Sequence, residues 1–100
     1  MSLSRRFGLF TLAATVTFST AVFAAPTFIN ILTGGTSGVY YPIGVGLSQI
    51  YGHDIQGAKT SVQATKASVE NLNLLQAGRG ELALALGDSV ADAWNGVADA

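Results

Sequence analysis

Small polar residues and glycines cluster in three short segments, and each segment directly follows an apolar run. The segments are Thr33–Gly38 (TGGTSG), Thr65–Ser68 (TKAS) and Gly87–Ser89 (GDS). Glycines let a ligand approach the backbone, and hydroxyl residues offer it O–H donors. If a helix follows each segment, the free N–H groups of its first turn favour an anion. The sequence therefore predicts a binding site for a small carboxylate-bearing solute, without a basic residue nearby.

The same residues have a simpler explanation, which the sequence leaves open. Ser68, Asp88 and Ser89 are of the types that cap helix N-termini. The glycines of the first segment would also suit a tight strand–helix turn. Tyr40 and Tyr41 follow that segment, and we expect at least one of them to line the site, because adjacent helical positions face different ways.

The patterns of common enzyme and cofactor motifs are not met. The first segment lacks the Gly-Lys pair of a phosphate-binding loop, since Val39 follows Gly38. Gly44 and Gly46 lack the third glycine of the dinucleotide-binding pattern. No serine has a histidine partner, since His53 is expected in a solvated loop far from the three segments. With no cysteine and one histidine, thiolate and multi-histidine metal sites are excluded. We therefore expect no catalysis, no metal and no cofactor.

Charge excludes one class of partner. Charged residues make up 11% of the chain, less than half of the roughly 25% usual in soluble domains. Residues 25–100 carry three Lys and Arg against six Asp and Glu, a net charge of −3. Binding to nucleic acid depends on clustered Lys and Arg that neutralise phosphates. Nucleic acid is therefore excluded as a partner.

The first 24 residues have the three-part pattern of a secretory signal peptide. Met1–Arg6 is a short basic region, Phe7–Ala21 is mostly apolar, and Val22 and Ala24 suit a cut before Ala25. A membrane anchor is the alternative, and the paired arginines leave the twin-arginine export route open beside the general one. We expect cleavage between residues 24 and 25 and a mature, periplasmic segment 25–100.

Apolar periodicity predicts strand and helix in alternation, three times over. The predicted strands and helices are Thr27–Thr33, Val39–Tyr51, Lys59–Ala64, Ser68 to a stop at Gly78, Leu82–Leu86, and a last helix after Asp88 with Trp94 in the core. Gly52 is expected to stop the first helix. This order is typical of a parallel α/β sheet, β-α-β-α-β-α. Three strands and three helices cannot cover both sheet faces, so we expect a truncated piece of a larger domain. A small domain that associates with itself is the alternative.

The segment Gly34–Gly44 (GGTSGVYYPIG) resembles the TAXI family, the extracytoplasmic solute receptors of one branch of TRAP transporters. Segments within Thr65–Gly78 and Glu81–Gly96 agree at matching spacing, so the resemblance covers residues 27–98. It implies a type II periplasmic-binding-protein fold, in which two α/β lobes hold the solute between them. This chain would then be the signal peptide and the first part of lobe one.

The resemblance also implies a function. Such a receptor delivers a small acidic solute, such as glutamate or a related dicarboxylate, to the membrane subunits of a TRAP-type permease. The residues that match the family's ligand loops are Gly35, Thr36, Ser37, Gly38 and Tyr41, then Ser68, Val69 and Asn71, then Asp88 and Ser89. Alternatives are a receptor of an ABC importer, a sensory domain of the same fold, and a secreted α/β enzyme truncated before its catalytic residues.

Overall fold

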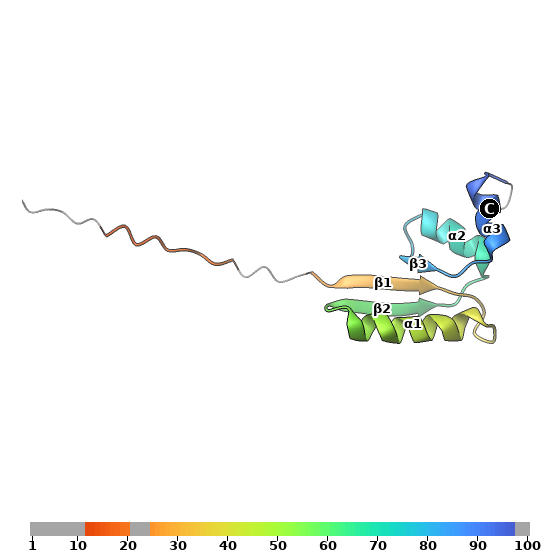
Figure 1. Cartoon of the computed structure of the whole chain (residues 1–100), viewed down its shortest axis with the longest axis horizontal. Helices are drawn as coiled ribbons and strands as arrows, with labels where there is room; N and C mark the ends of the chain where they lie inside the picture. The colour runs from red at the N-terminus through yellow and green to blue at the C-terminus, as the bar shows by residue number, and fades with distance from the viewer. Residues whose placement is uncertain (1–11, 21–24, 98–100) are drawn as a thin grey trace, which may run out of the picture.

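A strand–helix unit repeats three times in the computed structural model of the chain (Figure 1). The elements in chain order are β1 (Thr27–Leu32), α1 (Tyr40–Asp54), β2 (Ala58–Gln63), α2 (Ser68–Gln76), β3 (Leu82–Ala83) and α3 (Gly87–Trp94). The structure describes residues 12–20 and 25–97. Of the expected signal peptide, residues 1–11 and 21–24 lie outside the described residues, and so does the Ala24 side of the expected cut.

The three strands form one parallel sheet in the order β2-β1-β3. β1 pairs with β2 along its whole length, from Thr27 opposite Ala58 to Leu32 opposite Gln63. β3 pairs only with the last two residues of β1. The predicted parallel α/β class is therefore confirmed.

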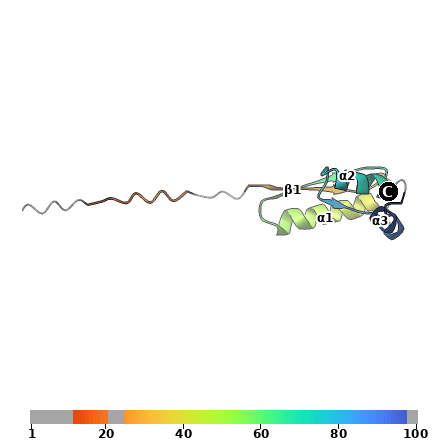
Figure 2. The same ribbon diagram turned by 90° about the horizontal axis from the view of Figure 1, so that it is seen from above.

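Helices α1 and α2 lie on opposite faces of this sheet, as Figures 1 and 2 show. Ile31 and Leu32 are neighbours in β1, so their side chains point to opposite faces. Ile31 faces Gly44 of α1, whereas Leu32 faces Gly80 in the connection after α2. The chain leaves β1 towards one edge and then crosses β1 to reach the other edge. Right-handed crossovers in opposite directions place their helices on opposite faces.

The small core lies at the carboxyl end of β1. Ile31, Leu32 and Thr33 are completely buried. A Cβ at Gly44 would collide with the Thr33 methyl and lie 3.2 Å from a Val62 methyl. The glycine inside α1 is thus explained by close packing of the helix on the sheet, which outweighs its helix-propensity cost of about 1 kcal/mol.

Several predicted details are corrected by the structure. α1 continues through Gly52 to Asp54, so His53 lies in its last turn, where it is exposed as expected. The glycine that turns the chain is Gly57, whose φ is +79°. β3 ends at Ala83, well before residue 86, because β1 offers only two residues to pair with.

The predicted core position of Trp94 is also wrong. Its side chain lies on α3, the last helix, and is 90% exposed. By contrast, Gly78 has φ of +74° just after α2, as expected of the glycine that ends a helix. Within residues 12–20 and 25–97, every helix falls short of the length and apolarity needed to cross a membrane.

Candidate functional site

The three polar segments of the sequence meet at the carboxyl edge of the sheet, around a cavity of about 400 Å³. The lining comes from the segments after β1, β2 and β3: Gly34, Gly35, Gly38, Val39, Tyr40, Ala67, Ser68 and Leu86. Its volume falls in the range of small-molecule sites. The edge is also where strand order reverses around β1, which is where open α/β sheets bind ligands.

All three helices begin at this cavity with an apolar N-cap residue. The N-caps are Val39 for α1, Ala67 for α2 and Leu86 for α3, and each of them lines the cavity. None of the three helices has a side-chain cap hydrogen bond. Val, Ala and Leu are among the poorest N-caps because they offer no acceptor to the first-turn N–H groups. The three helix N-termini therefore meet around one cavity, whose surface is almost entirely apolar.

The simple capping explanation fails for Ser68 and Ser89, whereas the Asp88 carboxylate does satisfy one first-turn N–H of α3. Ser68 is the first residue of α2, and its Oγ accepts the N–H of Leu86 at 2.9 Å instead of capping its own helix. Asp88 is inside α3, and its Oδ1 accepts the neighbouring N–H of Ser89 at 2.7 Å. Neither Asp88 nor Ser89 holds the N-cap position.

Asn71 fastens the segments around the cavity together. Its side chain is completely buried, and its amide nitrogen donates to the carbonyl oxygens of Thr33 at 2.6 Å and Leu84 at 2.8 Å. Its amide oxygen accepts the hydroxyl of Thr65 at 2.5 Å. One side chain on α2 therefore joins the ends of all three strands, and it fixes the distances between the loops that line the cavity.

The glycine-rich turn is open at Gly35. The N–H of Gly38 donates to the Gly35 carbonyl at 2.9 Å, so this donor is used inside the turn. A Cβ at Gly35 would have no heavy atom within 4 Å, and no positive φ requires glycine there. Neither backbone strain nor packing against the described residues accounts for glycine at this position. The space over its backbone belongs to the cavity.

Comparison with known families agrees with this geometry. A family model described as the NMT1-like family matches residues 31–100. The chain belongs to the NMT1-like family. The NMT1-like family is of the periplasmic-binding-protein type, so the expectation of a solute-binding, transport-related protein is confirmed at that level.

Within this NMT1-like chain, the predicted site residues fall into two groups. Gly35, Gly38 and Ser68 line the cavity. The other seven do not line it. Thr36, Ser37 and Asp88 are exposed, and Tyr41 and Ser89 are half-buried. Val69 lines a separate groove along α2, and Asn71 is buried.

Five lining residues were not among those predicted. Of the two adjacent tyrosines, Tyr40 lines the cavity and Tyr41 does not. Val39, Ala67 and Leu86 directly precede the three observed helices, and their apolar side chains gave no sign of a ligand site in the sequence. Gly34 lies at the end of the buried β1 segment, where its backbone carbonyl accepts the N–H of Thr65 at 3.2 Å.

The lining of the cavity contains no charged side chain. All eight lining residues are neutral, and the polar contribution comes from backbone groups and the hydroxyls of Ser68 and Tyr40. Among residues 12–20 and 25–97, no three His, Asp or Glu side chains lie close enough together to hold a metal ion. The arrangement offers a small molecule mainly apolar walls, with the three helix N-termini beside them.

Proposed function

We propose that the chain forms the first part of lobe one of an extracytoplasmic solute receptor. Residues 1–24 direct its export to the periplasm, with the cut between Ala24 and Ala25. The receptor captures a small anionic metabolite of the glutamate or dicarboxylate type. It then delivers this solute to a TRAP-type permease, as in the TAXI branch that the sequence resembles.

The observation that supports an anionic solute is the convergence of three uncapped helix N-termini on one cavity. Each N-terminus carries roughly half a positive charge, and its free N–H groups point along the helix axis. A carboxylate in the cavity would accept these hydrogen bonds without a lysine or arginine. The neutral lining fits this mode of binding, because no acidic side chain of the lining repels an anion.

Each matched residue then has a place in the binding cycle. Gly35 and Gly38 form the wall that the solute approaches, and Ser68 donates its hydroxyl proton. Thr36, Ser37, Tyr41 and Ser89 lie next to lining segments in the chain and complete the site when the two lobes close by a hinge movement. Val69 does so only if closure brings the solute to its side of α2. Asn71 positions the loops. Asp88, which is exposed in the first turn of α3, accepts a hydrogen bond from the ammonium group of an amino-acid solute.

The test is calorimetric titration of the mature protein, expressed from its complete gene, with glutamate, succinate and neutral glutamine. We expect an acidic compound to bind and glutamine to bind at least about tenfold more weakly, since the helix N-termini reward negative charge. Equal affinity for glutamine, or binding of none of a broad set of acidic metabolites, would refute the proposal.

A matched pair of variants locates the site. Gly35→Leu fills the open space over the turn and should abolish binding while the melting temperature stays unchanged. Gly46→Leu adds the same side chain on α1 at another position where a Cβ has no neighbour within 4 Å. The second variant should bind like the wild type. Loss of binding in both, or in neither, would contradict the placement of the solute in this cavity.

A further inference from the structure

At the start of α3, the cavity has an apolar residue where the fold itself favours a polar one. Leu86 is the N-cap of α3 and has the extended backbone of an ordinary N-cap, with φ of −68° and ψ of 144°. Asn, Asp or Ser would accept a first-turn N–H there, whereas leucine offers no acceptor. Leu86 is also 57% exposed, so its side chain is only partly covered by the described residues. The stability of the described fold therefore does not account for leucine at this position.

Ala67, at the start of α2, is a second residue of this kind. Its φ is +73°, and it is the one non-glycine residue with a positive φ in the part of the chain that the structure describes. Glycine adopts such a backbone without strain, whereas a Cβ is strained there. The Ala67 methyl nevertheless belongs to the cavity wall, beside Tyr40. A Cβ built at Gly34 would lie 3.6 Å from that methyl and 3.6 Å from Cδ2 of the Tyr40 ring.

These side chains give the cavity walls of carbon atoms. Leu86, Ala67 and the Tyr40 ring are joined by Val39, which is exposed, and the remaining lining is three glycines and Ser68. An exposed apolar side chain is ordinary when it stands alone. Here apolar side chains from all three loops meet around one space of about 400 Å³, a volume typical of small-molecule sites. The cavity therefore fits an apolar group of a small molecule.

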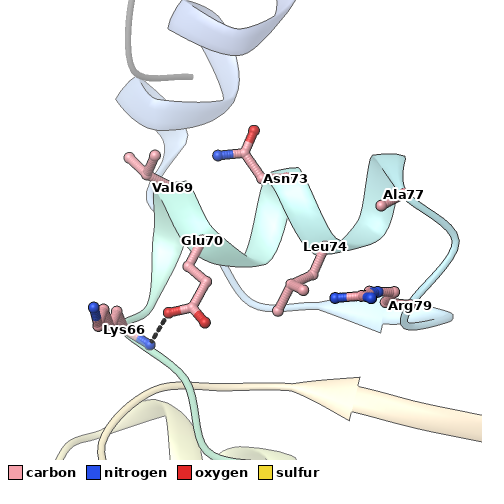
Figure 3. A pocket seen from close by; sticks show the side chains of 7 residues that line it. All are labelled: Lys66, Val69, Glu70, Asn73, Leu74, Ala77 and Arg79. Carbon is pink, nitrogen blue, oxygen red and sulfur yellow. Dashed lines mark hydrogen bonds between the residues drawn. The ribbon is translucent and has the colours of Figure 1, made fainter.

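A larger hollow along α2 has a different chemical character (Figure 3). Its volume is about 500 Å³, and its lining includes the charged side chains of Lys66, Glu70 and Arg79. Glu70 Oε2 accepts the N–H of Lys66 at 2.8 Å there. The lack of charge thus distinguishes the cavity at the carboxyl edge from its neighbour on the same helix.

We propose that the solute carries an apolar substituent beside its carboxylates, and that this substituent occupies the cavity against Leu86, Ala67 and Tyr40. The inference rests on the proposed function and narrows its solute class to diacids with a branched or aromatic carbon skeleton. The carboxylates then lie at the helix N-termini, where negative charge is favoured. The ammonium group of glutamate would instead lose hydration against carbon walls that offer it no acceptor. An aromatic substituent would also contact the face or edge of the Tyr40 ring favourably.

The experiment is calorimetric titration of the mature protein, expressed from its complete gene, with succinate, methylsuccinate and phenylsuccinate. These compounds share two carboxylates and differ only in the apolar substituent. We expect methylsuccinate to bind about fourfold more tightly than succinate, and phenylsuccinate at least about tenfold more tightly. Equal affinities, or tighter binding of succinate or glutamate than of phenylsuccinate, would overturn the inference and leave the proposed anionic solute standing.

Two further outcomes separate this inference from the proposed function. If none of the three diacids binds, the inference is overturned, and the broader set of acidic metabolites decides the proposed function. If phenylsuccinate and its neutral diamide bind equally well, the proposed anionic solute is refuted and the inference falls with it.

Leu86→Asn distinguishes a wall for the solute from a contact with another part of the receptor. Asparagine is a good N-cap, so the melting temperature should stay unchanged or rise. Affinity for phenylsuccinate should fall about tenfold, and affinity for succinate by less than about twofold. A lower melting temperature with equal losses for both diacids would show that Leu86 packs against the rest of the receptor, and it would overturn the proposed contact. Unchanged affinity for phenylsuccinate would overturn it as well.

The control is Ile50→Asn, which makes the same kind of change outside the cavity. Ile50 lies on α1, is 54% exposed and does not line the cavity. Both affinities should stay within about twofold of the wild type, because the solute does not reach this position. A loss of phenylsuccinate affinity as large as that of Leu86→Asn would contradict the placement of the apolar substituent.

Discussion

The role of Asn71 leads to the sharpest prediction on stability. Replacing Asn71 by alanine removes a completely buried amide and the three hydrogen bonds that join it to Thr33, Leu84 and Thr65. A typical intramolecular hydrogen bond contributes about 1 kcal/mol net, and a buried group left without a partner costs about 1–3 kcal/mol. The Thr65 hydroxyl lies 3.1 Å from the Thr33 carbonyl and can partly replace the lost donor there.

The expected loss is therefore about 3 kcal/mol from the three bonds. Alanine is the better helix former, and its propensity returns about 0.5 kcal/mol at this position in α2. The unfolding free energy of Asn71→Ala should fall by about 2–3 kcal/mol on balance. Asn71→Asp keeps the size but turns a carboxylate towards two carbonyl oxygens, so it should be at least as destabilising.

The assay is urea denaturation followed by circular dichroism, with Asn73→Ala as the control. Asn73 lies two residues further along the same helix and is exposed. Its substitution carries the propensity gain without the buried bonds, and it should leave stability unchanged or raise it by about 0.5 kcal/mol. If Asn71→Ala and Asn73→Ala differ by less than about 0.5 kcal/mol, the reasoning that Asn71 fastens the three strand ends is refuted.

Three further substitutions test the packing and the loops. Gly44→Ala should destabilise by about 1–2 kcal/mol, since its Cβ collides with Thr33 and overpacking outweighs the helix-propensity gain. A Cβ at Gly46 has no neighbour within 4 Å, so Gly46→Ala should raise the free energy of unfolding by up to about 1 kcal/mol in thermal or urea denaturation. If Gly46→Ala were the more destabilising of the two variants, the described packing of α1 on the sheet would be contradicted. Ser68→Ala removes the acceptor of the Leu86 N–H, so hydrogen exchange at that amide should speed up about tenfold. An unchanged rate would show that this bond does not hold the third loop.

Much of the fold was predictable because local patterns agreed with the tertiary structure. β1 combines β-branched residues with a following glycine turn, and its predicted bounds differ from the observed ones by one residue. β2 shows the strict alternation of a strand with one covered face, and its burial alternates in the same way. The meeting of the three polar segments followed from topology, because the carboxyl ends of parallel strands lie at one edge.

The errors arose where a neighbour decided the outcome. The apolar run Leu82–Leu86 was long enough for a strand, but β1 pairs with only its first two residues. Trp94 belongs to a helix with a clear apolar face, yet it is 90% exposed because periodicity shows which residues share a face and not what covers that face. Gly52 was a plausible helix stop, but the helix continued past it.

The candidate site likewise combines features that local sequence patterns predict with features that tertiary contacts decide. Residue type and spacing were enough to predict that the three loops meet at the carboxyl edge of the sheet. They did not distinguish the residues that line the cavity from those that support it. Asn71 matches a ligand loop in sequence, but in the structure its side-chain amide is hydrogen-bonded to Thr33, Leu84 and Thr65.

By itself, the sequence determined the alternation of strands and helices, the parallel sheet and the three loops at its carboxyl edge. These features depend on local periodicity and turn chemistry, which act over a few residues. The tertiary structure alone decided that apolar Val39, Ala67 and Leu86 stand at the three helix N-termini around one cavity. The physical reason is that side-chain and backbone contacts depend on distance in space and not on distance along the chain. The hydrogen bonds that join the strands and loops, for example, link residues that lie 13 to 51 positions apart.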